Sequence, residues 1–245
     1  LGIAAALVHT LAHALFKSSL FMLIGVVDHE TGTRDMRRLG KLYDKMPFTF
    51  ASMCVAAASM AAVPPLFGFV SKESILEAFH STPYGVILLV IGGIAAFLTF
   101  VYSAKIIFGA FVDGPKDMSH VHEAPVHFWL PAALPGLMSL VLPFMLARVD
   151  NPVTAGVQAV TGDGNYHSHL ALWHGVTAPF IVSMLVLVAG LAFIFVRKPV
   201  FAALENKELL PATGNDVLRG TVTGLAGLGK GLGKLADGFN PTRHM

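Results

Sequence analysis

Three titratable side chains lie at a regular helical spacing near the start of the sequence. His9, His13 and Lys17 stand at i, i+4 and i+8 within the apolar run 1–27. At about 100° per residue their directions span only about 80°, so one helix face carries all three. A cation inside a bilayer costs roughly several kcal/mol, so such groups usually face a bundle interior and serve an ion or proton path. We therefore predict that these residues form a proton relay.

The spacing of this set also sets a requirement for the relay. Successive members rise about 6 Å along the helix, so water must bridge their side chains. Three neighbouring basic groups also couple their titrations, and histidine changes its charge near neutral pH. The competing interpretation is two hydrogen-bonded core histidines beside a lysine that reaches the headgroups. Lys17 is too central in its segment for that reach.

A second candidate cluster follows the helix breakers Pro64, Pro65 and Gly68. We expect Ser71 to cap a short helix of about three turns, from 71 to 80, before Pro83 breaks the chain again. In its first turn, Glu73 would favour the positive end of the helix dipole and Lys72 would oppose it. A cation kept against the helix dipole indicates a functional role, so we include Lys72 and Glu73 in the predicted relay. The competing interpretation is an ordinary loop lysine beside a first-turn glutamate.

Weaker candidates are Glu77 and His80 on the same short helix, which a solvated face explains equally well, and Lys105, whose stem can reach the headgroups. Two loops are rich in histidine, but neither has a recurrent metal-ligand spacing, so we predict no metal site there. The histidines of these loops are His120, His122, His127, His167, His169 and His174.

The composition identifies the class of protein that must position these groups. Hydrophobic residues make up 54% of the 245-residue chain, charged residues only 13%, and the mean hydropathy is +0.66. A soluble domain of this length would rarely reach these values, so the sequence predicts an integral membrane protein. The net charge of +2 is too small to indicate nucleic acid binding, and the single Cys54 excludes a disulfide framework or a cysteine metal site.

The predicted fold is an all-α, polytopic transmembrane helix bundle of about five spans with one discontinuous helix. A discontinuous helix at membrane depth requires protein or a wet cavity around it. We expect residues 1–198 to form the transmembrane domain and residues 199–245 a polar, amphipathic, glycine-rich tail on the membrane surface or a neighbouring subunit. The predicted spans are 1–27, 48–63, 71–112 as one broken crossing, 125–149 with proline kinks, and 176–196, and a short helix is expected at 152–160.

Basic residues orient the predicted bundle. Thirteen of the 17 Lys and Arg residues fall in the loop 28–46, the loop 113–124 and the segment from Arg197 onward. The opposite side receives only Arg148. By the positive-inside rule, the two loops and the tail are predicted to be cytoplasmic.

An enzyme alternative starts from the same histidines. The HxxxH spacing of His9 and His13, together with HVH at 120–122, loosely resembles the histidine boxes of membrane di-iron desaturases and hydroxylases. Those boxes belong at a water-facing edge, whereas Lys17 continues the set into the span. Further boxes with paired histidines are also missing, so we do not favour this alternative.

Three motifs resemble a known family. HTLAHALFKSSLF at 9–21, DHETGTRD at 28–35 and VPPLFGFVSKESIL at 63–76 are similar to the large antiporter-like subunits of respiratory complex I and of Mrp-type multisubunit cation/proton antiporters. The 28–35 motif resembles the A subunit of the Mrp branch in particular. The resemblance is good to about residue 196 and faint in the tail.

This resemblance implies that the first segment is the relay helix of a second inverted repeat, with Lys72 and Glu73 on the discontinuous helix near the exit of the path. The expected function is proton transfer in a hetero-oligomeric Na⁺/H⁺ or K⁺/H⁺ antiporter of the inner membrane, without a bound cofactor. The alternative is the same module in a complex I or membrane-bound hydrogenase type oxidoreductase. Because Leu1 starts within an apolar run, we expect the chain to be a piece of a longer subunit.

Overall fold

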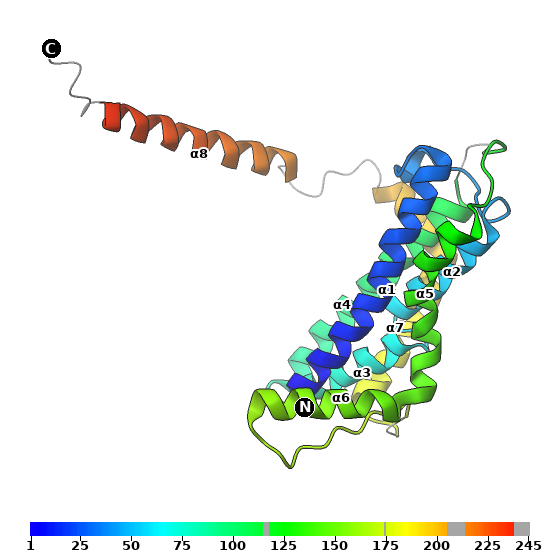
Figure 1. The fold of residues 1–245 in the computed structure, drawn as a ribbon, viewed down its shortest axis with the longest axis vertical. Helices are drawn as coiled ribbons and strands as arrows, with labels where there is room; N and C mark the ends of the chain where they lie inside the picture. The colour runs from blue at the N-terminus through cyan, green and yellow to red at the C-terminus, as the bar shows by residue number, and fades with distance from the viewer. Residues whose placement is uncertain (115–117, 174, 205–213, 238–245) are drawn as a thin grey trace. The chain divides into compact units, whose positions relative to one another are not determined.

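The computed structural model describes residues 1–114, 118–173, 175–204 and 214–237 (Figure 1). All the regular elements in this part of the chain are helical, which confirms the predicted all-α class. The α-helices are α1 Gly2–Thr31, α2 Pro47–Met60, α3 Phe67–His80, α4 Gly85–Ile107, α5 Val126–Val141, α6 Leu146–Thr161, α7 Ala178–Leu204 and α8 Gly214–Asp237. Two 3-10 turns, Met36–Arg38 and Leu142–Met145, and a π-helical turn, Phe108–Val112, complete the elements.

Four helical stretches among the described residues are long and apolar enough to cross a bilayer: Gly2–Arg38, Gly85–Val112, Val126–Thr161 and Ala178–Leu204. The predicted span 48–63 forms α2, which is also apolar but has only 14 residues. The chain divides into two compact units, Leu1–Phe195 and Val196–Met245. All the candidate residues lie in the first unit.

Helix α1 is the central element of the first unit and runs the length of the bundle (Figure 1). It packs against α2, α3, α5 and α6, and its buried side is formed by small and branched residues such as Val8, Ala12 and Leu23. The helix continues beyond the predicted end at residue 27 and stops at Gly32, which adopts φ 68° and donates its N–H to Asp28 O at 2.8 Å. A glycine adopts this left-handed conformation without steric cost, which explains the stop.

The loop 28–46 contacts the turn that ends the α4 crossing, and Glu123 contacts the start of α2. The backbone N–H groups of Leu42 and Tyr43 donate to Phe111 O at 3.1 and 3.2 Å. Glu123 accepts hydrogen bonds at the start of α2, from the Thr49 hydroxyl at 2.6 Å and the Thr49 N–H at 3.2 Å. The carboxylate therefore satisfies helix donors that would otherwise lack partners.

The broken crossing is formed by α2 and α3, so the prediction that 71–112 is one broken crossing is wrong. The last turn of α2 contacts the first turn of α3, where the Gly68 N–H donates to Ser59 Oγ at 3.2 Å. A Cβ on Gly68 would lie only 1.7 Å from Ser59 O, so only glycine allows this approach. Helix α4 then returns as a crossing of its own, which keeps the two basic loops at the same end.

Two further predicted boundaries differ from the structure. The segment 125–149 does not continue as one kinked span, because the chain turns at Leu142–Met145, which contains Pro143. Helix α6 then lies across the end of the bundle near the N-terminus (Figure 1). The short helix expected at 152–160 is part of α6, whose Val149, Val153 and Val157 are buried. This spacing of four places one apolar stripe against the bundle.

In the second unit, the end of α7 continues through Pro199 to Leu204. Helix α8 is continuous for 24 residues despite its glycines. Its apolar residues Val217, Leu218, Val222, Leu225, Leu228 and Leu232 are all exposed. The predicted domain boundary at residue 198 and the membrane-surface position of the tail stay predictions.

Candidate proton-relay cavity

His9, His13, Lys17 and Lys72 line one cavity of about 360 Å³. The first three come from α1 and Lys72 comes from α3, so the structure joins the two candidate clusters of the sequence. The other lining residues are Phe16, Met60, Ile75, Leu76, Phe79, Gly92, Ala95, Ala96, Thr99 and Tyr102. At about 30 Å³ per molecule, a space of this volume accommodates on the order of ten waters, enough to bridge groups about 6 Å apart along a helix.

The cavity is enclosed unevenly. His9 and Lys17 are half-buried, whereas His13 is exposed on the surface of the described chain. The rings of His9 and His13 are 6.1 Å apart between centroids, too far for a direct hydrogen bond. The predicted face is therefore present, but its middle member is not covered by the described residues.

Ser71 connects α3 to α1. Its Oγ lies 3.3 Å from His9 Nδ1 and donates to Gly68 O at 3.1 Å. The prediction that Ser71 caps α3 is wrong, because α3 begins at Phe67 and Ser71 is a buried residue inside the helix. Lys72 and Glu73 are therefore not in the first turn, and the dipole argument for them does not apply.

Lys72 and Glu73 are neighbours in sequence but face different partners. Lys72 Nζ is buried and makes no hydrogen bond to any described residue. Glu73 instead accepts a hydrogen bond from the Ser183 hydroxyl of α7 at 2.7 Å. Because an isolated charge in an apolar interior is costly, the placement of Lys72 beside the cavity marks it as a candidate functional group.

Tyr102 of α4 is a cavity residue that the sequence did not reveal. Lys17 Nζ donates to Tyr102 Oη at 3.5 Å and lies 5.4 Å from the ring centroid. The tyrosine hydroxyl donates to Met60 Sδ at 3.1 Å. This arrangement combines a weak hydrogen bond with a cation–π contact and holds the Lys17 ammonium beside the cavity.

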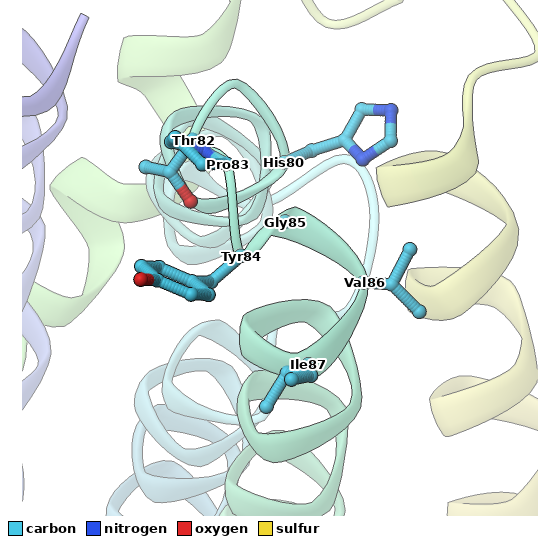
Figure 2. A pocket seen from close by; sticks show the side chains of 7 residues that line it. All are labelled: His80, Thr82, Pro83, Tyr84, Gly85, Val86 and Ile87. Carbon is cyan, nitrogen blue, oxygen red and sulfur yellow. The ribbon is translucent and has the colours of Figure 1, made fainter.

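The weaker candidates lie outside the cavity. Glu77 and His80 continue the Glu73 side of α3, since positions i, i+4 and i+7 share one helix face. His80 lines a separate pocket of about 300 Å³ at the turn between α3 and α4, whose residues are labelled in Figure 2. In Figure 2 the His80 side chain points away from Tyr84. Lys105 is exposed on α4 and does not line either pocket.

The remaining histidines do not form a metal cluster within the described part of the chain, where no group of three or more His, Cys, Asp or Glu side chains could hold an ion. His122 Nδ1 instead lies 3.4 Å from Glu30 Oε2, and His29 Nδ1 lies 3.0 Å from Glu30 Oε1. His174 lies outside the described residues. The pairing with Glu30 ties the 113–124 loop to the end of α1.

Comparison with known proteins identifies the family whose sequence profile matches the residues around this cavity. A family profile described as NADH:quinone oxidoreductase/Mrp antiporter, TM, matches residues 1–99. These residues form α1, α2, α3 and much of α4, and so contain the two histidines and two lysines of the cavity. Residues 1–99 of the chain belong to this family of antiporter-like transmembrane proteins.

Within that family, the chain is similar to the A subunits of Mrp-type antiporters, as its motifs predicted. It is 35% identical over 91% of its length to the Na(+)/H(+) antiporter A subunit of Alkalihalophilus pseudofirmus, and 34% identical over 85% to the probable K(+)/H(+) antiporter A/B subunit of Rhizobium meliloti. A solved structure of the Mrp complex from Dietzia sp. matches with a TM-score of 0.82 and 39% identity, covering 99% of this chain and 26% of that chain.

The chain spans 30% of the length of the Alkalihalophilus relative and 23% of the Rhizobium relative. Its family and its four apolar helical stretches make it a multi-pass membrane protein. Its relatives are named as transporter components rather than as classical enzymes.

Proposed function

We propose that this chain forms the proton-translocating part of a multisubunit monovalent cation/proton antiporter of the plasma membrane. The observation that carries the proposal is the cavity that joins His9, His13 and Lys17 of α1 to Lys72 of α3. Each of these side chains can accept and release a proton, and a hydrated space between them allows transfer over distances too long for direct hydrogen bonds. The names of the relatives support Na⁺ or K⁺ as the exchanged ion.

In this mechanism, protons move between α1 and Lys72 through the cavity, and Glu73 controls exchange with one side of the membrane. Glu73 suits that role because it lies next to Lys72 in the chain yet bonds to Ser183 on α7. From Glu73, the helix face that also holds Glu77 and His80 leads toward the turn between α3 and α4. We place this turn on the side opposite the cytoplasmic loops, as the positive-inside rule predicts.

The proposed partners follow from what the chain leaves uncovered. A titratable group facing lipid is costly, so the exposed His13 side of α1 is expected to pack against further protein of a hetero-oligomeric complex. The apolar faces of α4 and α7 expose Val90, Ile94, Leu185 and Val188, which suit membrane lipid.

A second candidate function is the same proton path in a quinone-linked or membrane-bound hydrogenase type complex, where the chain would belong to a translocase. The family profile covers both NADH:quinone oxidoreductases and Mrp antiporters. Neighbouring genes for small antiporter subunits would support the first function, and genes for hydrogenase or dehydrogenase subunits the second. Stoichiometric iron in the purified protein would instead support the di-iron enzyme.

The test uses the full-length protein in inverted membrane vesicles, with cation-driven dissipation of a pH gradient as the readout. Lys17→Ala and Lys72→Ala should each reduce exchange by at least about tenfold, equivalent to about 1.4 kcal/mol or more. Lys105→Ala should have a milder effect, since Lys105 does not line the cavity. Lys45→Ala, in the 28–46 loop, is the control for loss of a lysine charge. Normal exchange in both cavity variants would refute the relay.

A further inference from the structure

We propose that Ser71 is a positioning residue that fixes which ring nitrogen of His9 carries the proton. This inference rests on the proposed relay, in which His9 exchanges protons with the cavity. It concerns a contact between the relay helix α1 and the discontinuous helix α3. Ser71 is fully buried, so its hydroxyl has only the partners that the two helices provide.

The hydroxyl of Ser71 has one proton and two nearby groups that could receive it. Gly68 O lies 3.1 Å away, and a carbonyl oxygen can only accept. With its proton directed to Gly68, the hydroxyl can offer only a lone pair to His9 Nδ1 at 3.3 Å. Nδ1 must then be the donor, so neutral His9 carries its proton on Nδ1 and keeps a free lone pair on Nε2.

This tautomer gives His9 a defined direction of proton transfer. Nε2 becomes the nitrogen that accepts a proton, while Nδ1 is held by α3. The other titratable groups around the same cavity are His13 and Lys17 on α1, Lys72 on α3 and Tyr102 on α4. Because Ser71 directly precedes Lys72, a shift of α3 would change the orientation of His9 and the position of Lys72 together.

Ser74 provides a matched control on the same helix. Its hydroxyl donates to Val70 O at 2.9 Å, the ordinary bond of a helical serine to the preceding turn. It does not line the relay cavity. Ser74→Ala therefore removes the same kind of backbone bond as Ser71→Ala without changing a histidine partner.

The decisive experiment is solid-state NMR of the full-length protein with ¹⁵N-labelled histidine in lipid bilayers, with the His9 signals assigned by their loss in His9→Gln. We expect the Nδ1–H tautomer for neutral His9 in the wild type, in Ser74→Ala and in Ser71→Thr, which keeps the hydroxyl. Ser71→Ala should populate the Nε2–H tautomer. A wild-type His9 in the Nε2–H form, or an unchanged tautomer in Ser71→Ala, would overturn the proposal.

The wild-type spectrum decides the assignment even if Ser71→Ala fails to fold. Exchange assays give a second readout, in which Ser71→Ala should slow exchange by about fivefold, corresponding to a hydrogen bond of about 1 kcal/mol, while Ser74→Ala leaves it unchanged. The two proposals can fail separately. Normal exchange in Lys17→Ala and Lys72→Ala would refute the relay, whereas the tautomer of His9 tests Ser71 alone.

Discussion

Gly68→Ala is the substitution whose effect can be worked out most directly from the structure. The new Cβ would lie 1.7 Å from Ser59 O, a separation that real Cβ atoms do not show, so α2 and α3 must separate by more than about 1 Å. The shift also stretches the hydrogen bond from Gly68 N to Ser59 Oγ, now 3.2 Å long. Overpacking costs about 1–3 kcal/mol and the lost bond about 1 kcal/mol, so we expect destabilisation of about 2–4 kcal/mol.

The same shift moves Lys72, four residues further along α3, relative to the residues of α1. The thermal unfolding temperature of the purified full-length protein should therefore fall by several degrees, and exchange in inverted vesicles should fall with it. Gly25→Ala is the matched control, because a Cβ at Gly25 meets nothing within 4 Å. A Gly68→Ala protein that unfolds and exchanges ions like the wild type would show that α2 and α3 do not meet as described.

Three further predictions concern single contacts. Tyr102→Leu should reduce exchange in vesicles by about two- to fivefold, because it removes the cation–π contact with Lys17, worth about 0.5–1 kcal/mol at a partly exposed site. Tyr102→Phe should reduce exchange by less, because phenylalanine keeps this contact. Equal loss in both variants would contradict this prediction. Glu123→Ala should destabilise the protein by about 1–2 kcal/mol in denaturant unfolding, because it leaves helix N–H donors of α2 without their acceptor; an unchanged midpoint would refute the cap. The Arg37 guanidinium holds the pKa of Asp35 below its ordinary value. The ion pair between these two exposed residues is therefore retained at neutral pH and lost as the pH falls below about 4. An NMR titration that finds the Asp35 pKa at or above its ordinary value would contradict this prediction.

The helix α1 and its titratable face were largely predictable from the sequence, because their evidence is local. His9, His13 and Lys17 share a face by spacing alone, and the apolar residues around them require a membrane helix. The helix break was also predictable from Pro64, Pro65 and Gly68. Which crossing contains this break was not predictable, because whether α3 continues α2 or joins α4 depends on the contact between Gly68 and Ser59.

The partners of the candidate residues could not be predicted, because they come from distant parts of the chain. Tyr102 is 85 residues from Lys17, and Ser183 is 110 residues from Glu73. Ser71 is 62 residues from His9, and its sequence context favoured a capping role. In each case the hydrogen bond depends on helix packing, and an isolated serine or tyrosine in an apolar segment gives no local signal of it.

The resulting account connects the break in the crossing to the proposed transport. The break at Gly68 lets α3 start inside the bundle, which brings Ser71 to His9 and Lys72 to the cavity along α1. Gly68, Ser71 and Lys72 all lie in the first two turns of α3. The position of α3 is therefore the structural variable to which relay activity should respond most strongly.

The most direct test of the central claim is to block the cavity chemically. Thr99 lines the cavity, whereas its neighbour Leu98 is 57% exposed and does not. In the full-length protein with its native cysteines, including Cys54, replaced, Thr99→Cys and Leu98→Cys are treated with a small water-soluble methanethiosulfonate, and labelling is measured together with cation/proton exchange. The relay predicts that modified Thr99→Cys loses exchange while Leu98→Cys keeps it. Complete labelling of Thr99→Cys with unchanged exchange would contradict the account.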